Sequence, residues 1–140
     1  MAAYNKFNVF TTDLTNGKHD FSSHTYKVML TDTAPVAANT IKANITEISV
    51  GNGYLAGGLA TTISKSNTSG TEKIVATDVV FAATGNSIGP FRYAVLYNDT
   101  QTTPSKPLVA WFDYGSETTL NTGESFTVDF DGTNGLFTLG

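Results

Sequence analysis

Ser87 lies in Gly85-Asn86-Ser87-Ile88-Gly89, which matches the G-x-S-x-G pattern around the nucleophile of α/β-hydrolases. That chemistry needs the serine on a sharp strand-to-helix turn and a histidine later in the chain. Here Pro90 and a strand-like segment follow, and both histidines, His19 and His24, precede the serine. The segment is therefore predicted to be a glycine-flanked turn between two strands.

A second glycine-rich segment, Gly51-Asn52-Gly53-Tyr54-Leu55-Ala56, matches the loose form of the dinucleotide-binding fingerprint. That motif needs a helix directly after it, so that the helix N-terminus faces the pyrophosphate. Gly57 and Gly58 follow instead, and glycine disfavours a helix start. We predict a glycine-rich loop.

Imidazoles and carboxylates can ligate metals, and His19 and His24 have Asp13 and Asp20 nearby. Their five-residue spacing fits no single helix face, so we predict exposed side chains in a turn. The segment Asp129-Phe130-Asp131-Gly132 resembles part of a calcium loop but lacks the closing Glu. It is predicted to be a pair of acids beside a hairpin turn.

Glycoside hydrolysis needs two carboxylates facing each other in a cleft. Asp113, Glu117, Glu124 and Asp129 qualify by residue type alone, and twelve acids make such a choice easy. The sequence therefore predicts no catalytic, cofactor-binding or metal site, and a protein that is not an enzyme.

The two most hydrophobic segments carry a group of aromatic residues. Exposed aromatics can bind sugars or bases, but in a β domain most are core. Trp111 is predicted to be core, with Val109 and Asp113 on its face of the strand and Ala110 and Phe112 on the other. The aromatic group comprises Tyr93, Tyr97, Trp111, Phe112 and Tyr114.

The composition describes one domain spanning residues 1–140. Hydrophobic residues make up 40 %, but charged residues only 14 %, against about 25 % in an average domain. A net charge of −4 with eight scattered basic residues argues against nucleic-acid binding. Cysteine is absent, which excludes disulfides. No apolar run is long enough for a transmembrane helix, and the start lacks signal-peptide features, so we expect no membrane association.

Alternating hydrophobic residues predict strands through most of the chain, which is typical of an all-β fold, a β-sandwich or barrel-like. Thr-rich residues 4–14 are ambiguous. Tyr4, Phe7, Phe10 and Leu14 share a helix face, and Gly17 would end the helix, but Phe7 and Val9 also alternate as in a strand. We favour one short N-terminal helix. The expected strands cover 26–31, 59–66, 72–83, 91–97, 108–114, 125–130 and 136–139.

Residues 36–58 form a long excursion between strands, with one helical turn expected near Ile45–Ile48. A loop of this length is uncommon in a compact domain unless it has a function.

Several segments together resemble small structural proteins of tailed bacteriophages. Members of this size are often head decoration (cement) proteins on the outside of the capsid lattice, and the group has no catalytic residues. The resemblance spans nearly the whole chain. It rests on Ser87–Asn98, Asn52–Gly58, Pro107–Gly115, Gly123–Asp131, Tyr4–Phe7 and Leu30–Pro35.

The resemblance implies a virion protein made in the host bacterial cytoplasm, without cofactor. It would bind the major capsid protein on the capsid surface and stabilise the head. We expect a homotrimer, and we expect residues 36–58 to contact the lattice. The alternative is a tail component or a receptor- or glycan-binding module of the same virion.

Overall fold

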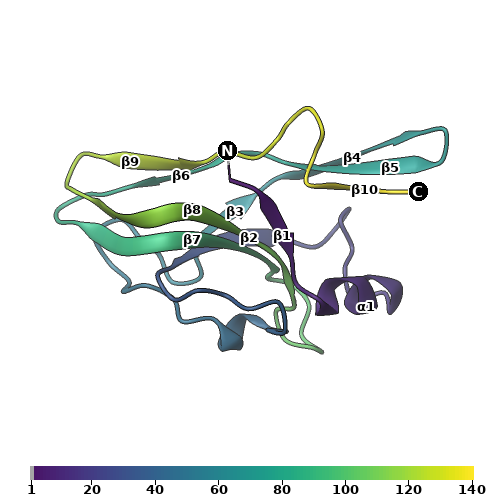
Figure 1. Cartoon of the computed structure of the whole chain (residues 1–140), viewed down its shortest axis with the longest axis horizontal. Helices are drawn as coiled ribbons and strands as arrows, with labels where there is room; N and C mark the ends of the chain where they lie inside the picture. Colours follow the sequence, from purple (N-terminus) through teal and green to yellow (C-terminus); the bar gives the residue numbers. More distant parts are fainter. Residues whose placement is uncertain (1) are drawn as a thin grey trace.

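The computed structural model describes residues 2–140, of which 47 % lie in strands and 7 % are helical. This confirms the predicted all-β fold. Two layers of strands pack face to face (Figure 1). No helix within residues 2–140 has the length and apolar character needed to cross a membrane.

The first layer is one five-stranded sheet in the order β1-β8-β7-β2-β3. Its two long central strands supply most of the hydrophobic surface, and they extend beyond the expected 91–97 and 108–114. The strands are β1 (Tyr4–Lys6), β2 (Tyr26–Thr31), β3 (Leu59–Thr61), β7 (Ile88–Asn98) and β8 (Leu108–Leu120).

The second layer consists of a three-stranded sheet, β10-β5-β4, and a two-stranded sheet, β6-β9. In Figure 1 they lie end to end above the first sheet, and the β4–β5 hairpin projects beyond it. The strands are β4 (Ile63–Thr68), β5 (Thr71–Ala76), β6 (Val79–Ala82), β9 (Ser125–Val128) and β10 (Phe137–Leu139).

Two segments expected to be single strands are each divided in two. Residues 59–66 break at Thr62, because β3 pairs with β2 in the first layer whereas β4 pairs with β5 in the second. Residues 72–83 break at Thr77 and Asp78, because β5 pairs with β4 and β10 whereas β6 pairs with β9. A change of pairing partner ends a strand without any change in hydrophobic alternation.

The main core lies between the two layers. It joins inward side chains of both, including Leu96 and Phe112 from the first layer and Phe81 and Val128 from the second. A smaller cluster lies on the opposite face of the first sheet. Its buried members are Phe7, Met29, Val95, Tyr97 and Leu108, with Trp111, Val9 and Ile45 partly buried against them.

The prediction that Val109 shares a face with Trp111 is wrong, because β8 has a β-bulge at Val109. Leu96 pairs with Ala110 and Tyr97 pairs with Leu108, so Val109 is an extra residue on β8. Val109 therefore packs in the main core, while Trp111 packs in the smaller cluster on the other face. Trp111 is half-buried, so its prediction as a core residue holds only in part.

The N-terminal residues form a strand followed by a helix. β1 pairs with β8, so Tyr4 lies on a strand and not on the helix face expected for it. Helix α1 (Val9–Thr15) confirms the favoured short helix. It ends at Asn16, and Gly17 follows with a φ of +73°, a conformation that glycine adopts easily.

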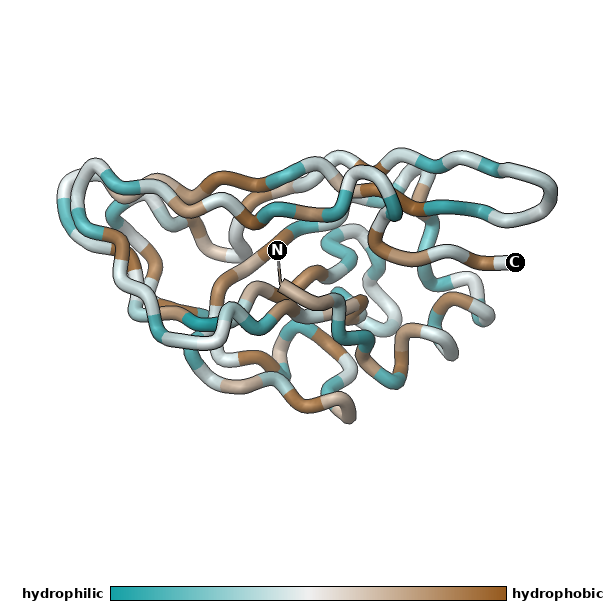
Figure 2. Tube along the Cα trace, turned by 45° about the horizontal axis from the view of Figure 1, so that its top comes forward, coloured by the Kyte–Doolittle hydropathy of each residue, from teal (hydrophilic) through white to brown (hydrophobic). Residues whose placement is uncertain are grey.

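The first part of residues 36–58 runs across the far face of the first sheet, below it in Figure 1, whereas Ile48 and Tyr54 pack in the main core. Ile45 packs against the smaller cluster, and the Ile48 amide donates to the Leu30 carbonyl of β2. The expected helical turn occurs three residues early, as the short 3-10 helix η1 (Lys42–Asn44). Hydrophobic stretches accordingly appear in Figure 2 on this lower side as well as between the layers.

Candidate functional site

Five large hydrophobic side chains are strongly exposed among the described residues, and three of them belong to residues 36–58. They are Val36 (55 % exposed), Val50 (59 %) and Leu55 (60 %). The other two, Val80 and Leu139, lie on β6 and β10. Singly exposed hydrophobics are ordinary, so this segment is a candidate because it carries three of the five.

Val50 and Leu55 flank a two-residue hairpin turn. Gly51 and Tyr54 exchange both backbone hydrogen bonds, at 2.9 and 3.0 Å, and the turn residues Asn52 and Gly53 have φ of +58° and +100°. Positive φ at both positions is what a type I′ turn requires. Val50 comes directly before this turn and Leu55 directly after it, and both side chains are exposed. We call these two exposed side chains the Val50–Leu55 pair.

The hairpin is anchored in the protein at its turn. The Tyr54 ring is fully buried and stacks on Phe81 at 5.7 Å. The Asn52 side chain donates to the Ser87 carbonyl at 3.0 Å, and its own carbonyl accepts from Thr84. The Val50–Leu55 pair is therefore exposed on a well-supported base.

Glu47 connects the two ends of this segment. Its Oε2 accepts hydrogen bonds from the Tyr54 hydroxyl and from the Gly57 amide, each at 2.7 Å. Its Oε1 lies 3.6 Å from the Lys42 amino group. The Tyr97 hydroxyl donates to the Gly57 carbonyl at 2.6 Å, which ties the same point to β7. We call these contacts the Glu47 network.

A groove of about 270 Å³ is lined in part by the residues that precede the hairpin. Asp32, Ser49 and Pro90 are among the residues that line it, so it adjoins Val50 along the chain. The carboxylate oxygen Oδ1 of Asp32 is buried without a hydrogen-bond partner within residues 2–140. The apolar pair thus has a hydroxyl- and carboxylate-rich flank.

The structure brings the two histidines together around Asn98, against the expectation of exposed side chains. The Asn98 amide nitrogen lies 3.3 Å from Nδ1 of His19 and 2.9 Å from Nδ1 of His24, and its oxygen accepts from the amides of Thr100 and Gln101. His19 is buried, and burial lowers its pKa to about 4. This cluster fastens the segment after α1 to the end of β7.

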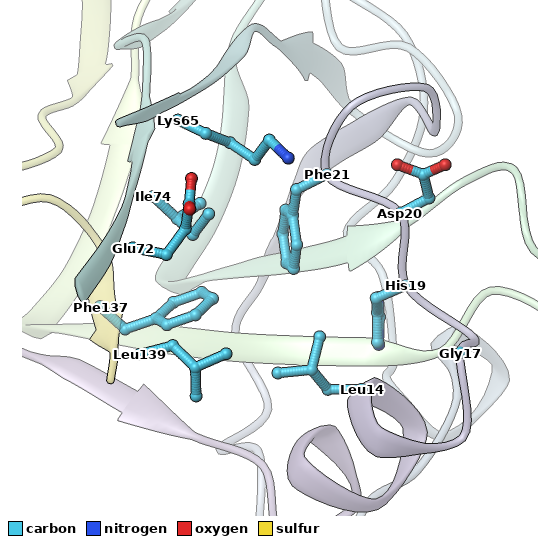
Figure 3. A pocket seen from close by; sticks show the side chains of 10 residues that line it. All are labelled: Leu14, Gly17, His19, Asp20, Phe21, Lys65, Glu72, Ile74, Phe137 and Leu139. Carbon is cyan, nitrogen blue, oxygen red and sulfur yellow. The ribbon is translucent and has the colours of Figure 1, made fainter. Parts of the chain in front are cut away.

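A pocket of about 410 Å³ lies between that segment and the β4–β5–β10 sheet. Figure 3 shows Lys65 extending across it toward Phe21, with Glu72 beneath Lys65 and Leu139 facing Leu14. Its walls are mainly hydrophobic, but charges of both signs stand at its edge. His19 lines it, and its Nδ1 is turned toward Tyr26, at 3.2 Å.

None of the catalytic patterns considered in the sequence forms an assembled site within residues 2–140. Ser87 leads into β7, not into a helix. Asp113 is paired with Arg92 at 2.8 and 3.0 Å, and Glu124 accepts from the Asn121 amide. Asp129 lines a separate pocket of about 330 Å³. Residues 2–140 contain no group of three or more His, Asp or Glu side chains placed to hold a metal ion.

Sequence reasoning singled out residues 36–58 but missed Glu47 and the Val50–Leu55 pair. The Asn52-Gly53 dipeptide between Val50 and Leu55 is a hairpin signal that would have placed the two side chains together. Nothing local marks Glu47, because its partners Lys42, Tyr54 and Gly57 lie five, seven and ten residues away. Comparison with protein-family models, curated proteins and solved structures found no match.

Proposed function

We propose that this chain is a structural protein of a tailed-phage virion, a decoration protein that binds the outer surface of the head. Its partner is the major capsid protein, and its role is to stabilise the shell without catalysis. The resemblance of several segments to phage structural proteins supports this class. The observation that carries the proposal is the concentration of exposed hydrophobic side chains on residues 36–58, three of the five in the described chain.

The energetics suit attachment by several copies. Burying one exposed Val or Leu side chain contributes roughly 1.5–3 kcal/mol, which alone gives a weak contact. A trimer presents three such surfaces at once, and linked contacts raise the overall affinity without any new interaction. We therefore propose a homotrimer bound at threefold or quasi-threefold positions of the lattice.

The test is a sedimentation assay in which purified protein is added to heads that lack it. We expect Val50→Ser/Leu55→Ser to weaken attachment by at least about 10-fold, because two apolar contacts are lost. Val80→Ser is the matched control, since Val80 is 52 % exposed but lies on β6. Equal loss in both variants, or wild-type protein that binds tails and not heads, would contradict the proposal.

The second candidate function is a tail component or glycan-binding module, and half-buried Trp111 is the observation that favours it. Its ring packs on Phe7 at 4.7 Å between ring centres, which leaves part of the indole free to stack on a sugar. Under this alternative Trp111→Ala abolishes binding to host-cell glycans. Under the decoration proposal it leaves head attachment unchanged.

A further inference from the structure

We propose that Glu47 is the positioning residue of the attachment surface, the side chain that holds the Val50–Leu55 pair in its binding geometry. This inference rests on the proposed function. Glu47 would fix the shape of the surface, which the exposed side chains cannot do themselves.

Glu47 lies just before the hairpin in the chain and contacts residues on its far side. The Val50–Leu55 pair lies between Glu47 and Gly57 along the chain, and one carboxylate oxygen receives hydrogen bonds from Tyr54 and Gly57. Glu47 therefore links the two ends of the segment that contains the Val50–Leu55 pair. Its two hydrogen bonds act beside the Gly58-to-Leu55 backbone bond and the Tyr97-to-Gly57 bond in restraining the arm that contains Leu55.

The two donors that bind Glu47 are themselves hydrogen-bonded to the first sheet. The Tyr54 hydroxyl that donates to Glu47 also accepts the Leu30 amide of β2, at 3.0 Å. Gly57, the other donor, accepts from Tyr97 of β7. The Glu47 network thus connects the exposed loop to β2 and β7 of the first sheet.

Removing the Glu47 carboxylate leaves the Tyr54 hydroxyl and the Gly57 amide without their acceptor, which costs free energy. The Tyr54 ring is fully buried and Gly57 is buried, so neither donor can easily turn to water when the carboxylate is removed. We expect the segment to loosen locally when these donors lose the carboxylate. A loosened surface has to be reordered on binding, which reduces affinity.

The experiment compares Glu47→Ala, Glu47→Gln and Glu117→Gln by amide hydrogen exchange and by the head sedimentation assay. Glu117 is exposed on β8, so its variant controls for the loss of a negative charge. In Glu47→Ala we expect exchange of the Gly57 amide to rise at least about 10-fold while amides of β7 and β8 stay protected. Attachment is expected to weaken by a similar factor.

Glu47→Gln should largely restore both readouts, because the single amide oxygen can take the place of Oε2 and accept from both Gly57 and Tyr54. Unchanged Gly57 exchange in Glu47→Ala overturns the inference, and so does faster exchange with unchanged attachment. If wild-type protein does not bind heads, the proposed function falls. The exchange arm then still decides whether Glu47 holds the hairpin.

Discussion

His19 is a buried imidazole whose Nδ1 faces the Tyr26 hydroxyl and the Asn98 amide. The Asn98 oxygen accepts two backbone amides, so its nitrogen must donate toward the histidines. Nδ1 of His19 lies 3.3 Å from this donor, so a protonated His19 ring would place two donors against each other. Burial, with a smaller contribution from the charge of His24, lowers the pKa of His19 to about 4.

This pKa predicts that stability falls with pH in a defined window. The unfolded chain takes up the proton near the ordinary pKa of 6.5, whereas the folded chain takes it up only near 4. Stability is therefore complete above pH 6.5 and is lost as the pH falls from 6.5 to 4, by on the order of 3 kcal/mol. Urea unfolding at several pH values measures this loss. His19→Gln should flatten the profile in that window, and an unchanged slope would contradict the assignment.

Trp111 allows a second prediction at the scale of one residue. Emptying a fully buried aromatic site costs about 3–5 kcal/mol. Because Trp111 is only half-buried against Phe7, we expect Trp111→Ala to cost less, about 1–3 kcal/mol in the free energy of unfolding. Thermal or urea unfolding of the variant provides the measurement. A loss above about 4 kcal/mol would mean that Trp111 is a full core residue after all.

At the scale of elements, the hairpin beside the Glu47 network depends on one glycine. A Cβ on Gly53 would lie 2.3 Å from the Ala82 carbonyl oxygen, and its φ is +100°. We expect Gly53→Ala to cost about 2–4 kcal/mol and to weaken attachment. Gly70→Ala is the matched control, because Gly70 has a φ of +90° but open space around it. If both variants lose equal stability in urea, the close approach to β6 contributes nothing.

The elements show which features local sequence could predict. Alternation predicted strands at both central segments, and a shared helix face predicted α1, because these patterns arise within a few residues. The breaks at Thr62 and Thr77, and the bulge at Val109, depend on which strand lies alongside. Pairing partners come from distant parts of the chain, so local alternation could not reveal them.

The candidate site shows the same division. Loop length alone led to the prediction that residues 36–58 have a function, and length is a local property. The buried positions of His19 and Tyr54 were not predictable, since each depends on partners such as Asn98 and Leu30 that only the fold brings near. The pairing of the two histidines through Asn98 likewise spans more than seventy residues.

At the scale of the whole molecule, composition predicts how attachment responds to salt. With 14 % charged residues, few ion pairs are available to an interface, and burial of apolar surface is not screened by ions. We expect binding to heads to persist up to about 1 M salt, where the Debye length is roughly 3 Å. Binding that collapses with salt in the sedimentation assay would show that charged groups carry the interface.

Multivalency adds a prediction about assembly. If three linked contacts hold a trimer on the lattice, a variant that stays monomeric should bind heads about 10²–10⁴-fold more weakly. Analytical ultracentrifugation gives the oligomeric state of the free protein, and the same sedimentation assay gives the affinity. Equal affinity for monomer and trimer would contradict attachment by linked contacts.

The central claim is that the chain lies on the outside of a phage head. Electron microscopy of virions produced with and without this chain tests it most directly. We expect density to disappear from the outer surface of the head shell at threefold or quasi-threefold positions, while the tail is unchanged. Density that disappears from the tail, with an unaltered head, would contradict it.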